Sequence, residues 1–301
     1  MGGKHDDEGG SGVISTGPID EPVDGWGGVD VRSGRAELLA DADRPGGWLL
    51  LLDRIRQSYV DLDHPTYLDF EYIRILADVL DALPAGPLRI THVGGGGLTL
   101  ARYVAATRPG STQVVFEPDD SLTALVRSRL PLRRGSRIRV RPVDGRTGIH
   151  GLRPRSADVV VLDAFSGGRV PADLTTAEAM SEIGRVIRPD GVLLANLADG
   201  PPLQYARRVL ATVRSVLPDV VAIADSAVLR GRRFGNVCLA AGRMALPEPA
   251  IRSAAARADF PLRVLGGERL RAFIGGASPL TDADPVRSPP PPDETWRVGG
   301  A

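Results

Sequence analysis

The chain has 301 residues, with 37 basic and 37 acidic side chains, so its formal net charge at neutral pH is zero. This balance argues against a protein held mainly by nucleic-acid phosphates, because that mode of binding needs an excess of basic residues. No apolar run approaches the roughly 20 residues needed to span a bilayer, and residues 1–12 lack the apolar core of a secretory signal. We therefore expect a cytoplasmic globular protein.

The cysteine and lysine content excludes several kinds of site. Cys238 is the single cysteine, which rules out an internal disulfide and a cysteine metal cage. Its apolar surroundings, residues 236–241, favour a buried core residue over a reactive thiol. Lys4 is the single lysine, so we expect no catalytic lysine in the folded part.

Changes in composition along the chain predict four regions. Residues 1–30 are rich in Gly, Asp and Ser without hydrophobic periodicity, which predicts a disordered tail. Residues 31–65 are predicted to form a small N-terminal β-hairpin domain, and residues 66–276 a larger domain of alternating strands and helices. Prolines in a polar context predict that residues 277–301 form a disordered tail without a packed core.

The first predicted elements are strands. Residues 35–40, 47–53 and 55–60 have strand character, and a turn signal separates the first two. An amphipathic helix is predicted over 67–83, where Pro84 and Gly86 end it.

Strands and helices then alternate to the end of the folded body. Strands are predicted at 88–93, 113–116, 138–143, 157–162, 191–197, 220–225 and 236–241. Helices are predicted at 98–107, 119–130, 177–187 and 203–217. Near-continuous apolar strands that alternate with helices predict an α/β fold with a mostly parallel, seven-stranded sheet covered on both faces.

Glycine or acidic residues follow the first four strands of this sheet. They are Gly94-Gly95-Gly96-Gly97, Glu117, Asp144-Gly145 and Asp163. Ligands of open α/β sheets bind beyond the carboxyl ends of the strands, so these residues are expected to share one site. Glycines let a ligand lie against the backbone and a helix N-terminus, and an acidic residue about 20 positions later accepts hydrogen bonds from both ribose hydroxyls. The combination predicts an adenosine-type ligand.

Each member of this set also has a purely structural interpretation. The glycine run is compatible with a bare turn, and Glu117 with a solvated strand end. Asp144-Gly145 is a common turn dipeptide, and Asp163 is able to cap the next segment. His92, inside the strand that precedes the glycines, is predicted to be a core histidine rather than a catalyst.

The glycine run lacks the spaced G-x-G-x-x-G pattern of dinucleotide-binding proteins, and the strand pattern resembles the Rossmann-like class I S-adenosylmethionine-dependent methyltransferase fold. Over about residues 35–242 the chain more specifically resembles the spermidine synthase family of polyamine aminopropyltransferases, including its N-terminal β-hairpin domain. The residues that carry this resemblance are 47–53, Gln57, 67–71, 93–96, 117–119, 144–145 and 159–163.

The resemblance implies a transferase whose co-substrate is decarboxylated S-adenosylmethionine, with no prosthetic group and no metal. Its aminopropyl group would pass to putrescine or a related amine, and methylthioadenosine would leave. Asp163 would be the catalytic residue that binds and deprotonates the amine, because an ammonium has no lone pair. The nucleoside would be held by Gln57, Gly94, Gly95, Gly96, Glu117, Asp144, Gly145, Pro171, Ala172 and Leu174. Family members tend to be dimeric, so we expect a homodimer.

Departures from the family pattern are concentrated in the half that binds the amine. Gly97 stands where the family has an aspartate, and Ser166 replaces its second gate aspartate. Residues 69–70 replace a Tyr-His or Tyr-Gln pair, although Glu71 is kept, and 226–229 lack the tyrosine of the diamine channel.

These departures leave three functions open. An acidic pocket of Asp163 with the substrate-binding residues Asp69 and Glu71, or with Asp61, would serve an aminopropyltransferase; Asp69 is also able to pair with an arginine instead. Gly97 favours an S-adenosylmethionine-dependent methyltransferase, because a glycine does not repel the carboxylate of the intact co-substrate. A non-catalytic homologue that binds a nucleoside is the third alternative.

Overall fold

The structure is a computed structural model that describes residues 28–292. Most of the predicted N-terminal tail, residues 1–27, and the last nine residues, 293–301, lie outside this range. The end of that predicted tail belongs to a strand, β1 (Val29–Val31). Among residues 28–292, no helix is both long and apolar enough to cross a membrane.

The N-terminal region forms a four-stranded antiparallel sheet with the order β1-β2-β3-β4. Its other strands are β2 (Gly34–Ala40), β3 (Gly47–Leu52) and β4 (Ile55–Asp61). Asp53 and Arg54, both with positive φ, form the two-residue turn between β3 and β4, as the right-handed twist of a hairpin favours. The pairing register shifts opposite Leu50 and Leu51, which leaves Gln57 as an extra residue in a β-bulge.

The large sheet has eight strands in the order β12-β10-β11-β9-β8-β5-β6-β7. The five strands that pair in parallel are β5 (Arg89–Val93), β6 (Thr112–Phe116), β7 (Ile138–Arg141), β8 (Ala157–Leu162) and β9 (Ile187–Asp199). The antiparallel pairs involve β10 (Asp219–Asp225), β11 (Gly235–Gly242) and β12 (Leu262–Leu265). The predicted fold class is confirmed, and β12 is an eighth strand, at the edge, beyond the seven predicted.

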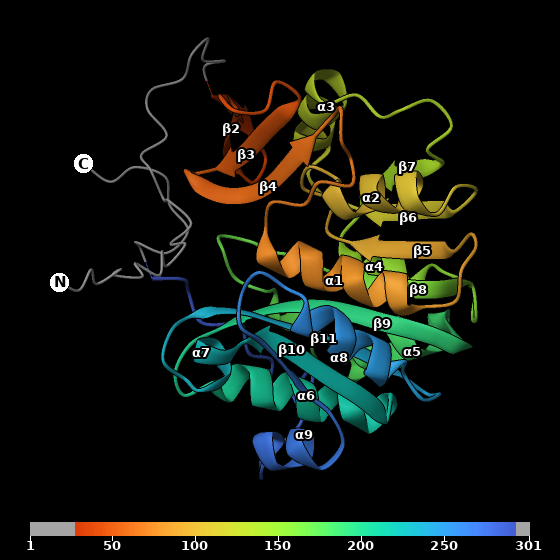
Figure 1. Cartoon of the computed structure of the whole chain (residues 1–301), viewed down its shortest axis with the longest axis vertical. Helices are drawn as coiled ribbons and strands as arrows, with labels where there is room; N and C mark the ends of the chain where they lie inside the picture. Colours follow the sequence, from red (N-terminus) through yellow and green to blue (C-terminus); the bar gives the residue numbers. More distant parts are fainter. Residues whose placement is uncertain (1–27, 293–301) are drawn as a thin grey trace, which may run out of the picture.

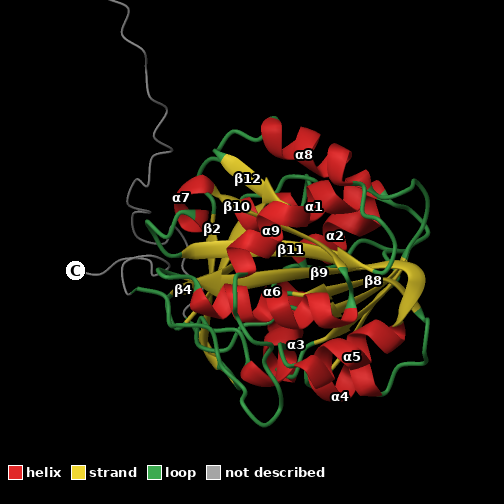
Figure 2. Ribbon diagram, turned by 90° about the horizontal axis from the view of Figure 1, so that it is seen from below, coloured by secondary structure: helices red, strands yellow, loops and turns green. Residues whose placement is uncertain are grey.

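Helices cover both faces of the large sheet (Figures 1 and 2). One face carries α1 (Glu71–Ala82), α2 (Thr99–Thr107) and α8 (Glu248–Ala256). The other carries α4 (Gly145–His150), α5 (Ala177–Val186), α6 (Gln204–Val216) and α9 (Gly267–Ile274). The remaining helices are α3 (Asp120–Arg129), which packs with the N-terminal sheet, the short α7 (Ser226–Leu229) and the 3-10 turn η1 (Ala172–Leu174).

Residues 277–292, which we call the C-terminal strap, differ from the predicted tail because they pack against the body of the protein. Leu280 and Ser288 are fully buried. The Leu280 amide donates a hydrogen bond to Thr212 Oγ1 (2.8 Å), and its carbonyl accepts one from the Ala177 amide (2.8 Å). Groups of α5 and α6 thus satisfy both backbone polar groups of the buried Leu280.

Candidate active site

The glycine loop joins β5 to α2 at the carboxyl edge of the sheet. Gly94 and Gly96 have φ of 98° and 47°, a region that favours glycine. A Cβ at Gly94 would lie 2.1 Å from the carbonyl oxygen of Asp163. Glycine at this position therefore lets the ends of β5 and β8 approach each other closely.

Glu117, directly after β6, lies across the glycine loop. Its Oε2 accepts hydrogen bonds from the amides of Gly95 (3.0 Å) and Gly96 (3.4 Å), and its Oε1 accepts one from Asp119 (3.1 Å). Burial raises the pKa of the Glu117 carboxyl, and these backbone donors oppose that rise. The structure thus brings the predicted ribose-binding residue and the glycines together.

Asp144 and Gly145 begin α4 beside the same edge. Asp144 Oδ1 accepts from the Thr147 amide (2.8 Å), and this bond holds the pKa of its exposed carboxyl below the usual value. Asp144 therefore caps helix α4, a structural role other than the turn dipeptide considered for it, and its contact with adenine stays a prediction. Gly145 is buried between β5 and η1, since a Cβ there would lie 2.2 Å from Val93 Cγ1 and 3.2 Å from Leu174 Cδ2.

The residues predicted to cover the adenine, Pro171, Ala172 and Leu174, lie at the end of residues 166–174, which we call the covering segment. Pro171 and Ala172 are half-buried, and Leu174 is buried next to Gly145. The C-terminal strap holds this covering segment: Ser288 Oγ accepts from the Val170 amide (2.8 Å). The Ser288 carbonyl accepts from Arg169 Nε (2.6 Å).

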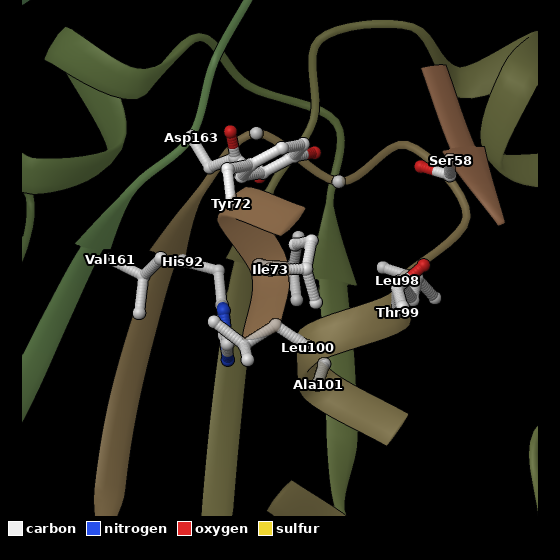
Figure 3. A pocket seen from close by; sticks show the side chains of 13 residues that line it. Ser58, Tyr72, Ile73, His92, Leu98, Thr99, Leu100, Ala101, Val161 and Asp163 are labelled. Atoms are coloured by element: carbon white, nitrogen blue, oxygen red, sulfur yellow. The ribbon is translucent and has the colours of Figure 1, made fainter. Parts of the chain in front are cut away.

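Asp163 follows β8 and is half-buried at the mouth of a pocket. The low-dielectric surroundings of its carboxyl raise the pKa to about 6, although hydrogen bonds from Asn196 and Tyr72 oppose this rise. Asn196 Nδ2 donates to Asp163 Oδ1 (2.9 Å). Tyr72, in the first turn of α1, lies beside Asp163, and burial together with the carboxylate raises the pKa of its phenol (Figure 3).

The pocket extends from these two side chains beneath the glycine loop. Gly94 and Gly95 line it together with these two side chains. His92 also lines it, below Asp163 and Tyr72 in the view of Figure 3. Burial lowers the pKa of His92 to about 4, and its Nε2 donates to Gln113 Oε1 (2.8 Å). His92 is therefore the neutral core histidine that the sequence predicted.

The predicted acidic pocket is not assembled in this structure. Asp69 pairs with Arg56 (3.3 Å), which was the alternative considered for it, and Glu71 is exposed at the start of α1. Asp61 pairs with Arg44 (3.3 Å) and accepts from the His64 amide (2.7 Å). Within residues 28–292, Asp163 is the one carboxylate that lines the pocket.

The N-terminal sheet packs directly on the glycine loop at Gly97. The Gly97 amide donates to Ser58 Oγ (3.0 Å), and Ser58 lines the pocket while its half-buried neighbour Gln57 does not. A Cβ at Gly97 would lie 2.9 Å from Val60 Cγ2 and 3.0 Å from Ser58 Cβ. Strand β4 therefore occupies the space that an aspartate at this position would need.

Sequence reasoning missed four polar residues of this region. Ser58, Tyr72, Asn196 and Asn236 contact the glycine loop, Asp163 or each other. The available signal was the occurrence of Asn196 and Asn236 in otherwise apolar strands, where an aliphatic residue would continue the pattern. Tyr72 gave no such signal, because an aromatic residue suits an amphipathic helix equally well.

Comparison with known proteins identifies the family. No protein-family model matches the chain. The structure of a probable spermidine synthase from Corynebacterium glutamicum is 32% identical and covers 85% of this chain and 96% of that one, with a TM-score of 0.80. The structure of human methyltransferase-like protein 13 in complex with SAH has a TM-score of 0.51 at 20% identity, over 68% of this chain and 93% of that one, and shows the shared fold.

Curated relatives agree with this assignment. A polyamine aminopropyltransferase of Neisseria meningitidis serogroup A is 27% identical over 146 residues, which are 48% of this chain and 55% of the relative. The chain thus matches about half the length of the curated relatives. The 32% identity over nearly the whole of the Corynebacterium protein, together with the glycine loop, Glu117 and Asp163 at one sheet edge, shows that the chain belongs to the spermidine synthase family of polyamine aminopropyltransferases.

Proposed function

We propose that this protein is an aminopropyltransferase that uses decarboxylated S-adenosylmethionine, alkylates putrescine or a related amine, and releases methylthioadenosine. The observation that carries the proposal is the Asp163 carboxylate at the mouth of the pocket, beside the glycine loop. The names of the relatives support the reaction class. The glycines and Glu117 would bind the nucleoside, and residues 171–174 would cover the adenine.

The proposed reaction is a displacement at carbon. The amine nitrogen attacks the propyl carbon next to the sulfonium, the carbon–sulfur bond breaks, and its electron pair remains on sulfur to give the neutral thioether. Before this attack Asp163 takes one proton from the ammonium form of the substrate, which frees the nitrogen lone pair, and the product keeps the positive charge as a secondary ammonium. Because its pKa is about 6, the carboxyl is mostly ionised at neutral pH and ready to receive that proton.

The electrostatics of the pocket favour this role for Asp163. A carboxylate in low-dielectric surroundings is costly unless it is paired, and the ammonium form of the substrate supplies the missing cation. Tyr72 and Asn196 hold the carboxylate in place without neutralising it. The site would therefore attract an amine first and then use the same group as its base.

A second candidate is an S-adenosylmethionine-dependent methyltransferase on the same scaffold. One observation favours it: Gly97 lies against Ser58 and Val60, so no side chain there repels the carboxylate of intact S-adenosylmethionine.

Calorimetric titration with decarboxylated and with intact S-adenosylmethionine separates the two candidates. We expect tighter binding of the decarboxylated form, followed by release of methylthioadenosine when putrescine or a related amine is added. The Asp163→Asn variant should bind the nucleoside but form no product. Tighter binding of the intact form would favour the methyltransferase, and binding without turnover by any amine would favour the non-catalytic homologue.

A further inference from the structure

Three polar side chains form a row across neighbouring strands at the carboxyl edge of the sheet. Leu162 pairs with Ala195 in the parallel register of β8 and β9, so Asp163 comes opposite Asn196. Asn196 in turn pairs with Cys238 of β11. Asn236 lies two residues before Cys238 and therefore on the same face of the sheet.

Each of these residues continues a row that is otherwise apolar and buried under α1. The preceding members of the three rows are Val159 and Val161, Val192 and Leu194, and Ala240 and Cys238. An aliphatic residue at each of these three positions would serve the packing equally well. The three polar residues therefore call for an explanation beyond the stability of the sheet.

Two hydrogen bonds join the three side chains, and both are donated in the direction of Asp163. Asn236 Nδ2 donates to Asn196 Oδ1 (2.9 Å), and Asn196 Nδ2 donates to Asp163 Oδ1 (2.9 Å). An ionised carboxylate only accepts hydrogen bonds, so the amide nitrogen of Asn196 must face Asp163 and its carbonyl must face Asn236. Asn196 is 1% exposed, so no water competes for this arrangement.

We propose that Asn236 is a positioning residue that acts on the Asp163 carboxylate through Asn196. Its amide fixes the orientation of the Asn196 amide and polarises it, because hydrogen bonds in a chain strengthen one another in a low dielectric. The inference deepens the proposed function and rests on it, since Asp163 is the group that would bind and deprotonate the amine.

The other titratable groups that face Asp163 are neutral, so its negative charge is stabilised by neutral hydrogen-bond donors alone. Tyr72 of α1 and Cys238 of β11 are neutral at pH 7, because burial raises the pKa of both. His92 of β5, in the same pocket, is neutral because burial lowers its pKa. Among the described residues, the groups that stabilise the Asp163 anion are Asn196 and Tyr72, and Asn196 alone is held by a further residue of the row.

Direct titration of the Asp163 carboxyl tests the proposal without requiring turnover. Carbon-13 NMR of the full chain, labelled at the aspartate side-chain carboxyls, gives the titration midpoint, and the Asp163→Asn spectrum identifies the signal. Loss of a hydrogen bond to a charged group should raise the midpoint in Asn196→Leu by roughly 1–2 pH units. Asn236→Leu, which keeps the number and branching of the side-chain heavy atoms, should raise it by about 0.5 pH unit, as expected for the loss of a polarising partner.

Val237→Ala is the matched control, because Val237 is the next residue of β11 and its buried side chain packs on the opposite face of the sheet, away from the row. Its midpoint should equal that of the wild type. Asn236→Ser, which is too short to reach Asn196, replaces Asn236→Leu should that variant not fold. Equal midpoints in the Asn236 variants and in Val237→Ala would overturn the proposal.

The kinetic measurement separates this inference from the proposed function. If both hold, the acid limb of kcat/KM for aminopropyl transfer moves upward in Asn236→Leu by the same amount as the NMR midpoint. If the midpoint moves but the wild type releases no methylthioadenosine, the positioning role stands and the proposed function fails. If the wild type turns over and the midpoint does not move, the proposed function stands and the positioning role fails.

Discussion

At the scale of single residues, the charge of Asp163 is the most costly feature of the site. Its carboxyl has hydrogen-bond donors but, within residues 28–292, no cation among the groups that shift its pKa. Burial therefore favours the protonated form in the folded protein, and the ionised form that the proposed reaction requires is less stable there than in the unfolded chain.

Because burial favours the protonated carboxyl of Asp163, the free energy of unfolding should fall as the pH rises through the pKa values of this group. The folded protein keeps a proton on Asp163 up to pH about 6, whereas the unfolded chain loses it near pH 4. Between these values the folded state binds more protons, so the free energy of unfolding falls as the pH rises. Asp163→Asn lacks this fall, so at pH 8 it should be more stable than the wild type by on the order of 1–2 kcal/mol.

Urea unfolding of both proteins between pH 4 and pH 8 measures this difference. The two free energies of unfolding should diverge through pH 5 and 6 and remain apart above pH 7. A difference that is the same at every pH would show that the substitution acts through packing instead of through ionisation.

Glu117 is the residue on which nucleoside binding should depend most. Glu117→Ala removes a carboxylate that already lies beside the glycine amides. Losing charged hydrogen bonds to the ribose should weaken methylthioadenosine binding by about 1.5–3 kcal/mol, or roughly 10- to 150-fold in Kd. Calorimetry checks this, with Asp190→Ala as the control because Asp190 is exposed before the buried part of β9. Unchanged affinity in Glu117→Ala would refute the ribose assignment.

At the scale of elements, the site depends on two segments that pack against its loops from opposite ends of the chain. Strand β4 lies against the glycine loop through Ser58 and Val60. The C-terminal strap lies against the covering segment through Ser288. Each contact predicts a distinct consequence of mutation.

The contact of β4 with the glycine loop predicts that Gly97→Ala is destabilising. Its Cβ would meet Val60 Cγ2 at 2.9 Å, and overpacking of this kind costs about 1–3 kcal/mol. Val60→Ala removes the clashing methyl groups, so the double variant should regain at least about 0.5 kcal/mol relative to the sum of the single changes. A double-mutant cycle of urea unfolding measures this coupling, and strictly additive effects would contradict the close contact.

The contact of the strap predicts a change in protease sensitivity. Ser288→Ala leaves the buried Val170 amide without its acceptor. This should cost about 1–3 kcal/mol of stability and should first increase local unfolding of the turn before Val170. Trypsin should then cleave faster after Arg169, whose side chain the Ser288 carbonyl holds. Ser278→Ala is the control, because Ser278 is an exposed residue of the same strap. Equal cleavage rates in the two variants would show that the strap does not secure the turn.

At the scale of the whole molecule, the strands and the residues that follow them could be predicted from the sequence, because local patterns determine them. The apolar run 157–162 is β8, and the run 113–116 differs from β6 by one residue. The residues after the parallel strands were placed correctly because the carboxyl ends of such strands meet at one edge. Glu117 and Asp163 are the examples of greatest consequence, since both lie against the glycine loop or the pocket beneath it.

What the sequence did not predict depends on contacts between distant residues. Strand β12 has four residues, and its conformation comes from pairing with β10 rather than from its own pattern. Helix α1 begins at Glu71, not at residue 67, and this start places Tyr72 in the first turn, beside Asp163. The pairing of Asp69 with Arg56 likewise depends on how β4 meets the segment before α1.

The strap also sets an order of events during synthesis. Ser288 emerges from the ribosome 118 residues after Val170, the amide that it satisfies. At translation rates of about 5–20 residues per second, the wait lasts roughly 6–24 s. During that interval strands β9 to β12 are still being made, and the covering segment lacks its partner until the strap appears. A nascent chain would thus carry the glycine loop, Glu117 and Asp163, the residues proposed to bind the substrates, well before the strap can secure the covering segment.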